Sequence, residues 1–215
     1  MHSGDSSCVF PAHSLSQTIQ DQLREQMVKL AKALKVVGLM NAQFAVKSVS
    51  VSGSVSDEIY VLEVNPRASR TVPFLAKATG LPLAKIATQC MAGIPLPDAL
   101  LHTHTHTHTF VSVKKAVFPF AKFPGADPIL GPEMRSTGEV MGIAKTLGQA
   151  FLKAEMGANS KLPQSGRAFI SVRDADKPRV ISIAKKLIQL GFDIVSTSGT
   201  ALALQNALVP CEVVN

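Results

Sequence analysis

Tryptophan is absent from this sequence of 215 residues, tyrosine occurs once, and cysteine occurs only three times. Cys8, Cys90 and Cys211 are odd in number and follow no spacing pattern, so we expect reduced thiols rather than a disulfide framework. Apolar runs are short and interrupted, so no membrane-spanning helix is expected. The first ten residues lack a basic region and an extended apolar stretch, so we expect no secretory signal.

Charged residues are also few, at 17%, although the net charge is +7. Nucleic-acid binding typically requires clustered lysines and arginines with interleaved aromatic side chains. Here the basic residues are dispersed and aromatic residues are scarce, so we expect no nucleic-acid partner. An anionic substrate such as ATP fits the positive charge at least as well.

Hydrophobic periodicity predicts a first domain of mixed helices and strands. Ile19, Leu23, Met27, Leu30 and Leu34 recur at helical spacing, which predicts an amphipathic helix over 14–37 with a Ser14/Gln17 capping box. Two strands joined by a Ser/Val/Gly loop over 48–56 should follow. The further elements expected in this domain are strands over 41–49, 59–64 and 111–119 and helices over 71–79, 83–91 and 147–156.

A polar stretch over 157–166 marks a boundary between domains 1–160 and 161–215. After it, strand and helix patterns alternate, which is typical of a parallel α/β domain. The expected elements are strands over 168–172 and 193–196 and helices over 178–190 and from 201 onward. The fold class is therefore α/β, with an incomplete second domain.

Candidate functional residues gather in the segment 61–70. Glu63 and Asn65 are two residues apart, so on a strand they project from one face. Both offer oxygen to a hard cation such as Mg²⁺. Arg67 and Arg70 follow Pro66 as guanidinium groups suited to a phosphate or small anion.

Gln43 becomes a third oxygen ligand if the strands 41–49 and 59–64 pair antiparallel. A structural alternative stays open, in which Glu63 and Asn65 form an ion pair and a cap with the two arginines as partners.

The tract His102–Thr109 alternates histidine and threonine. On a strand, all four imidazoles would share a face and could bind a transition metal. A CA dinucleotide repeat in the gene would produce the same tract without any function.

Three blocks of the sequence resemble the carbamate-phosphorylating half of the carbamoyl phosphate synthetase large subunit, of the bacterial and plastid type. They are Gly38–Val46, Glu63–Phe74 and Gly131–Gly142. The resemblance runs nearly end to end. It implies that 1–160 is the later portion of an ATP-grasp unit and that 161–215 begins a methylglyoxal-synthase-like regulatory domain.

The resemblance also implies roles for individual residues. His2 and Ser3 would lie beside ATP, and Gln43, Glu63 and Asn65 would hold Mg²⁺ or Mn²⁺ at the phosphates, with Gln43 and Glu63 also contacting ATP. Arg67 and Arg70 would face the carbamate and the transferring phosphoryl group. Glu139 would lie near the route by which carbamate arrives. Lys177, Thr197 and Thr200 would bind an anionic allosteric effector, a pyrimidine nucleotide in the bacterial-type enzymes.

The activity implied is ATP-dependent carbamoyl phosphate synthesis for the pyrimidine and arginine pathways, in the cytoplasm or a plastid. Bicarbonate would be a substrate, carbamate an intermediate, and a glutaminase small subunit a partner. We expect the chain to be a fragment or truncated gene model that is inactive alone. Two alternatives stay open: another ATP-grasp ligase of the biotin carboxylase kind, and a non-catalytic nucleotide-binding or regulatory remnant.

Overall fold

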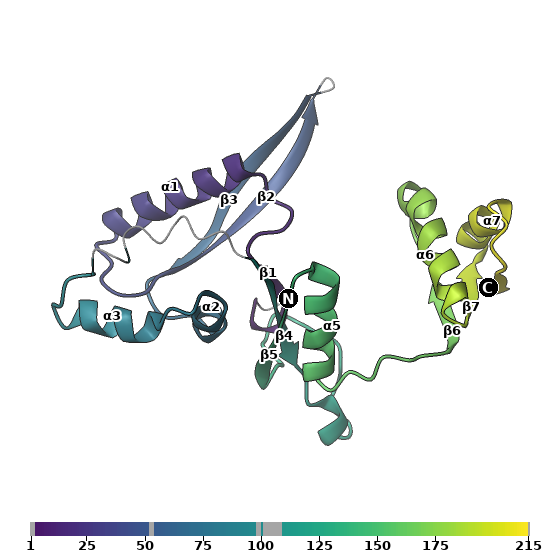
Figure 1. Ribbon diagram of the computed structural model, residues 1–215. Helices are drawn as coiled ribbons and strands as arrows, with labels where there is room; N and C mark the ends of the chain where they lie inside the picture. The colour runs from purple at the N-terminus through teal and green to yellow at the C-terminus, as the bar shows by residue number, and fades with distance from the viewer. Residues whose placement is uncertain (1–2, 52–53, 98–99, 101–108, 215) are drawn as a thin grey trace. The chain divides into compact units, whose positions relative to one another are not determined.

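The computed structural model describes residues 3–51, 54–97, 100 and 109–214, and for Ser3, 50–51 and 54–55 only the backbone. It divides into two compact units, Met1–Ser160 and Lys161–Asn215. Helices and strands are mixed in both units (Figure 1), which confirms the α/β class. Residues 102–108 of the His-Thr tract lie outside the described residues.

The first unit begins with a short 3-10 helix η1 (Ser3–Asp5), strand β1 (Cys8–Phe10) and helix α1 (Gln17–Ala33). The predicted Ser14/Gln17 capping box is wrong, because the hydroxyl of Ser16 accepts the N–H of Ile19 at 3.3 Å. Helix α1 also ends earlier than predicted. Lys35 adopts a left-handed φ of 51°, which terminates the helix before Val37.

Strands β2 (Asn41–Val51) and β3 (Ser54–Asn65) form a long antiparallel hairpin, visible in Figure 1. The predicted antiparallel pairing is confirmed, with Gln43 opposite Glu63 and Asn41 opposite Asn65. The loop predicted over 48–56 is wrong. Alternating Ser and Val residues there fit the two-residue period of a strand, so the ladder continues to Val51 and Ser54.

Helices α2 (Thr71–Thr79) and α3 (Leu83–Met91) have the predicted bounds. Gly80 ends α2 with a left-handed φ of 74°, a conformation that glycine adopts without the steric cost of a Cβ. Each helix buries a side chain, Phe74 from α2 and Ala87 from α3.

Strands β1, β4 (Val111–Val117) and β5 (Gly138–Ala144) form an antiparallel sheet in the order β1-β4-β5. A 3-10 helix η3 (Phe120–Lys122) follows β4. Helix α5 (Leu147–Gly157) packs on this sheet, and its residues Ala150 and Ala154 are fully buried with Val113 and Ala144. The small side chains of α5 let the helix approach the sheet closely.

The second unit is a parallel sheet in the order β6-β7-β8 with two helices. Its elements are β6 (Gly166–Ile170), the 3-10 helix η4 (Asp174–Asp176), α6 (Lys177–Gln189), β7 (Phe192–Thr197), α7 (Ser198–Asn206) and β8 (Glu212–Val214). Leu204, Ala184 and Ile194 lie in its buried core. Helix α7 begins at Ser198 and not at 201, so the turn residues Ser198–Thr200 are its first turn.

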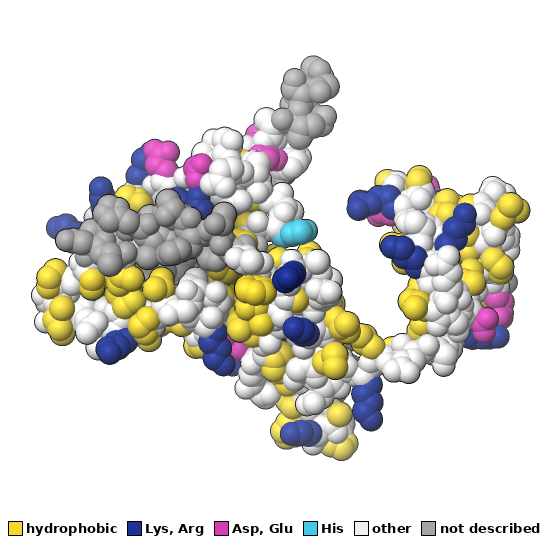
Figure 2. Space-filling model, viewed as in Figure 1, with side chains coloured by type: hydrophobic (Ala, Val, Ile, Leu, Met, Phe, Trp, Pro, Cys, Tyr) yellow, Lys and Arg dark blue, Asp and Glu magenta, His cyan; other side chains and the backbone are white. Residues whose placement is uncertain are grey.

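Hydrophobic side chains stay exposed on the first unit. Figure 2 shows them gathered over the region of α3, where Met91 and Ile94 are more than half exposed.

Among the described helices, none has the length and apolar character that crossing a bilayer requires.

The close approach of β5 and α5 predicts the effect of substituting Gly142. A Cβ at Gly142 would lie 2.0 Å from the carbonyl oxygen of Ala150 and 2.5 Å from the nitrogen of Ala154. Gly142→Ala should therefore lower the free energy of unfolding by about 1–3 kcal/mol, because a packed helix must move. Thermal unfolding monitored by circular dichroism measures this loss.

Gly148→Ala is the matched control, since a Cβ built at this α5 residue meets nothing within 4 Å apart from its chain neighbours and the nearby helix backbone. It should leave the melting temperature unchanged or raise it, because alanine favours a helix by about 0.5–1 kcal/mol over glycine. Equal melting temperatures for the two variants would contradict the packing described here.

Candidate functional site

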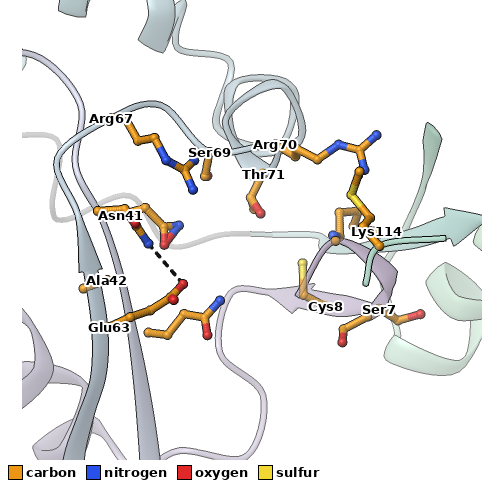
Figure 3. A pocket seen from close by; sticks show the side chains of 15 residues that line it. Ser7, Cys8, Asn41, Ala42, Glu63, Arg67, Ser69, Arg70, Thr71 and Lys114 are labelled. Atoms are coloured by element: carbon orange, nitrogen blue, oxygen red, sulfur yellow. Dashed lines mark hydrogen bonds between the residues drawn. The ribbon is translucent and has the colours of Figure 1, made fainter. Parts of the chain in front are cut away.

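A cavity of about 600 Å³ opens between the hairpin, the start of α2 and the segment that leads into β1. Gln43, Glu63, Asn65, Arg67 and Arg70 all line it. Figure 3 shows Glu63 on the hairpin side, Arg67 on the turn above, and Cys8 and Lys114 across the cavity. Residues that are distant in the sequence therefore line the same cavity.

The hairpin provides the oxygen-rich wall. Its register places Gln43 opposite Glu63. The amide nitrogen Nδ2 of Asn65 donates to Oε1 of Glu63 at 3.0 Å, so that bond leaves the Oδ1 acceptor of Asn65 unused. One carboxylate and two amide oxygens suit a hard divalent cation that also keeps water or phosphate ligands. The residues present thus fit a metal–phosphate site, although no three His, Cys, Asp or Glu side chains cluster in the described part of the chain.

Two arginines follow at the end of β3. The N–H of Arg67 donates to the carbonyl of Asn65 at 2.8 Å, which closes a tight turn, and its Nη1 donates to the carbonyl of Ala68 at 3.1 Å. Arg70 is the residue before α2, and its Nη1 donates to Ser136 Oγ at 3.4 Å and contacts Met134 Sδ. Among the described ion pairs, neither arginine is paired with Glu63, which argues against the structural alternative.

The opposite wall carries a thiol and an ammonium. Cys8 of β1 lies opposite Lys114 of β4 in the sheet register. The Lys114 side chain is only 3% exposed, and its Nζ lies 3.5 Å from Oε2 of Glu139. Burial raises the pKa of the Cys8 thiol above its ordinary value, and Glu139 adds to this rise while the Lys114 ammonium opposes it. The thiol is thus held mainly in its neutral form.

Glu139 does not line the main cavity. It lies with Lys114, Phe74 and Lys77 around a neighbouring cavity of about 460 Å³. Lys114 lines both cavities, so the two cavities share this buried cation.

Of the other residues named from the sequence, His2 and the side chain of Ser3 lie outside the described residues.

The second unit brings Lys177 and Thr197 to the start of α7. Lys177 Nζ pairs with Asp174 at 2.7 Å and lies 3.3 Å from a Cβ built at Gly199. That ammonium holds the pKa of Asp174 below its usual range. Thr197 Oγ1 shares a hydrogen bond of 3.0 Å with Ser171.

Thr200, which the resemblance implies as an effector ligand, already uses its hydroxyl within the second unit. Its hydroxyl accepts the N–H of Val172 at 3.2 Å and lies 3.3 Å from the Val172 carbonyl, and the residue is 1% exposed. To contact an effector, this hydroxyl would have to exchange its partner.

Sequence reasoning missed several cavity residues. Those that line the cavity beyond the predicted set include Ser6, Ser7, Cys8, Asn41, Ser69, Thr71, Lys114 and Met134. The strand register could have identified Asn41, since it pairs with Asn65. Cys8 and Lys114 reach the cavity because β1 pairs with β4, which lies far away in the sequence. No local sequence pattern predicts that pairing.

Two family models match the chain. Residues 1–99 match the carbamoyl-phosphate synthase L chain, ATP binding domain, and residues 179–215 match the MGS-like domain. The matches fall in the first and second unit, respectively.

Curated bacterial proteins are similar over the whole chain. A carbamoyl phosphate synthase large chain of Xylella fastidiosa is 54% identical over 215 residues, which cover 100% of this chain and 20% of that protein. The proteins of the same name from Pseudomonas syringae and Ralstonia nicotianae are 56% and 53% identical, and 19% of each is covered. The chain thus spans about a fifth of the length of these relatives.

The environment of Cys8 predicts its reactivity. In a chain carrying Cys90→Ser and Cys211→Ser, iodoacetamide should modify Cys8 with a pH midpoint above that of free cysteine, since only the thiolate reacts. Lys114→Met should move the midpoint higher still, because the ammonium that lowers the pKa is gone. Mass spectrometry of modification rates between pH 7 and about 10.5 measures both.

Lys115→Met is the control for this series. Lys115 lies on the same strand but pairs with Glu155, so its loss should leave the Cys8 midpoint unchanged. A Cys8 midpoint below that of free cysteine would contradict the described environment.

Proposed function

The chain belongs to the carbamoyl phosphate synthase large-chain family, and we propose that residues 1–160 take part in the ATP-dependent phosphorylation of carbamate. The main observation in support is that five residues selected for this chemistry line one cavity: Gln43, Glu63, Asn65, Arg67 and Arg70. Because the chain spans about a fifth of its relatives, we propose that it does not turn over substrate alone.

In this proposal Gln43, Glu63 and Asn65 hold a divalent cation, Mg²⁺ or Mn²⁺, against the phosphates of ATP. When bound, the cation neutralises phosphate charge that would otherwise repel the attacking oxygen. The oxygen-rich hairpin wall and the hydrogen bond between Asn65 and Glu63 support this assignment. His2 and Ser3 would lie beside ATP.

The reaction is a transfer of the γ-phosphoryl group. A carbamate oxygen forms a bond to the γ-phosphorus as the bond to the β–γ bridging oxygen breaks, and ADP leaves with that oxygen. Arg67 and Arg70 would orient carbamate and bind the charge that spreads over the transferring oxygens. Both arginines lie at the cavity, and Arg70 lies directly before α2.

Glu139 is proposed to lie near the route by which carbamate reaches this cavity. Its contact with Lys114, which lines both cavities, supports that position.

The same proposal includes bicarbonate as the source of carbamate and a glutaminase small subunit as the source of nitrogen. A cytoplasmic or plastid location remains a prediction. No observation favours a biotin carboxylase-like ligase, because the matching family model and relatives carry the carbamoyl phosphate synthase name.

We further propose that the second unit binds a nucleotide effector through Lys177, Thr197 and Thr200. Lys177 Nζ lies beside Gly199 in the first turn of α7. The first N–H groups of any helix have no acceptor within the helix, and together with an adjacent ammonium they suit a phosphate group. Asp174 competes for Lys177, so an effector would have to displace or share this carboxylate.

The catalytic proposal is tested in a hybrid large chain, defined as the Xylella fastidiosa relative in which this chain replaces its 215 matching residues. The hybrid should form ATP from ADP and carbamoyl phosphate with Mg²⁺ present. Glu63→Gln should lower the rate by at least about 100-fold, because an oxygen ligand loses its charge. Luciferase luminescence measures the ATP formed.

Glu58→Gln is the matched control on the same strand, since Glu58 is exposed, accepts a hydrogen bond from Tyr60 and does not line the cavity. It should keep the rate of the unmodified hybrid. An inactive but folded hybrid, or equal rates for both variants, would contradict the proposal.

The effector proposal predicts that Lys177→Met weakens binding of UMP to the hybrid by about 10-fold or more, since an ammonium–phosphate contact is lost. Isothermal titration calorimetry measures the dissociation constant. Lys185→Met removes an exposed lysine from the same helix and should leave the constant unchanged. Equal weakening in both variants would point to net charge rather than a defined pocket.

A further inference from the structure

Asp5 is a buried carboxylate outside the set of residues assigned above. It is 5% exposed at the end of η1, and the cavity lining begins at its neighbours Gly4 and Ser6. Its Oδ2 accepts the N–H of Arg135 at 2.9 Å and its Oδ1 accepts the N–H of Ser136 at 2.8 Å. Both carboxylate oxygens thus bind consecutive backbone donors of a segment that lies 130 residues away in sequence.

Ser136 extends this connection toward the cavity. The side chain is 5% exposed, and its hydroxyl donates to the carbonyl of Gly4 at 3.1 Å. A hydroxyl has one proton, so the bond to Gly4 directs the oxygen lone pairs to another neighbour. That neighbour is Arg70, whose Nη1 donates to Ser136 Oγ at 3.4 Å.

Met134 contributes to the same arrangement. Its sulfur contacts Nη1 of Arg70, so residues two apart in the 134–136 segment hold the same guanidinium nitrogen. An arginine side chain has many rotamers, and fixing the fork before substrate binds removes that conformational cost from the reaction. In the described part of the chain, Nη1 donates both hydrogen bonds that the Arg70 guanidinium makes to side chains.

We propose that Asp5 and Ser136 are positioning residues for Arg70. Asp5 fixes the backbone of the 134–136 segment, and Ser136 then holds the Arg70 guanidinium at the cavity. This inference rests on the proposed role of Arg70 in phosphoryl transfer. It predicts that Ser136 affects the reaction through Arg70 alone, whereas a residue that only supports the fold would act independently of Arg70.

A double-mutant cycle in the hybrid large chain tests this prediction, with ATP formation from ADP and carbamoyl phosphate as the assay. Arg70→Ala should lower kcat by about 1000-fold. Ser136→Ala should lower kcat by about 10- to 100-fold with less than about a 2-fold change in the KM for ADP, because only the transferring group loses its contact. The double variant should match Arg70→Ala alone within about 2-fold.

Asp5→Asn should reproduce the kcat loss of Ser136→Ala, since an amide offers one acceptor oxygen where the carboxylate offers two. Thr137→Ala alters an exposed neighbour of the same segment and should keep kcat and KM unchanged. Melting temperatures of all variants show whether any loss comes from unfolding.

The outcomes separate the two proposals. Multiplicative losses in the double variant, or an unchanged kcat in folded Ser136→Ala, would overturn the positioning role while leaving Arg70 as a catalytic residue. Full activity of Arg70→Ala would overturn the proposed role of Arg70, and the positioning role with it.

Discussion

The antiparallel register of the β2–β3 hairpin is the constraint on which the candidate site depends. Pairing Gln43 with Glu63 and Asn41 with Asn65 places their side chains along one end of the two-stranded ladder. A shift of one residue would turn Glu63 and Asn65 to the other face, since side chains alternate along a strand. The oxygen-rich wall of the cavity therefore depends on the backbone register of the two strands, which brings these side chains together.

The remaining walls come from burial of polar groups in the first unit. Lys114 and Asp5 are both nearly inaccessible, and each is compensated by a specific partner, Glu139 for the ammonium and two backbone N–H groups for the carboxylate. Unpaired, either charge would be costly to bury. These contacts join segments from both ends of the unit, so the cavity forms only when the β1-β4-β5 sheet is assembled.

The local sequence pattern correctly predicted the bounds of helices that are separated by helix-breaking residues. The segments 71–79 and 83–91 matched because Gly80 and Pro82 separate them. Ends without such signals were missed, as where Ser16 and not Ser14 caps α1. Strands β1 and β5 escaped prediction because their stability comes from pairing with β4, far away in sequence. For the same reason sequence proximity identified Arg67 and Arg70 but could not connect Arg70 to Ser136 or Asp5.

If the hairpin register creates a metal–nucleotide site, Mn²⁺ bound with ATP should broaden amide resonances at that end of the hairpin. The measurement adds Mn²⁺ and ATP at low ratio to the isotope-labelled chain and records the broadening of each amide resonance. Gln43, Glu63 and Asn65 should broaden most, and Glu63→Gln should abolish the effect. Broadening centred on the histidines of 102–108, or broadening that Glu63→Gln leaves unchanged, would show that the hairpin does not form the metal site.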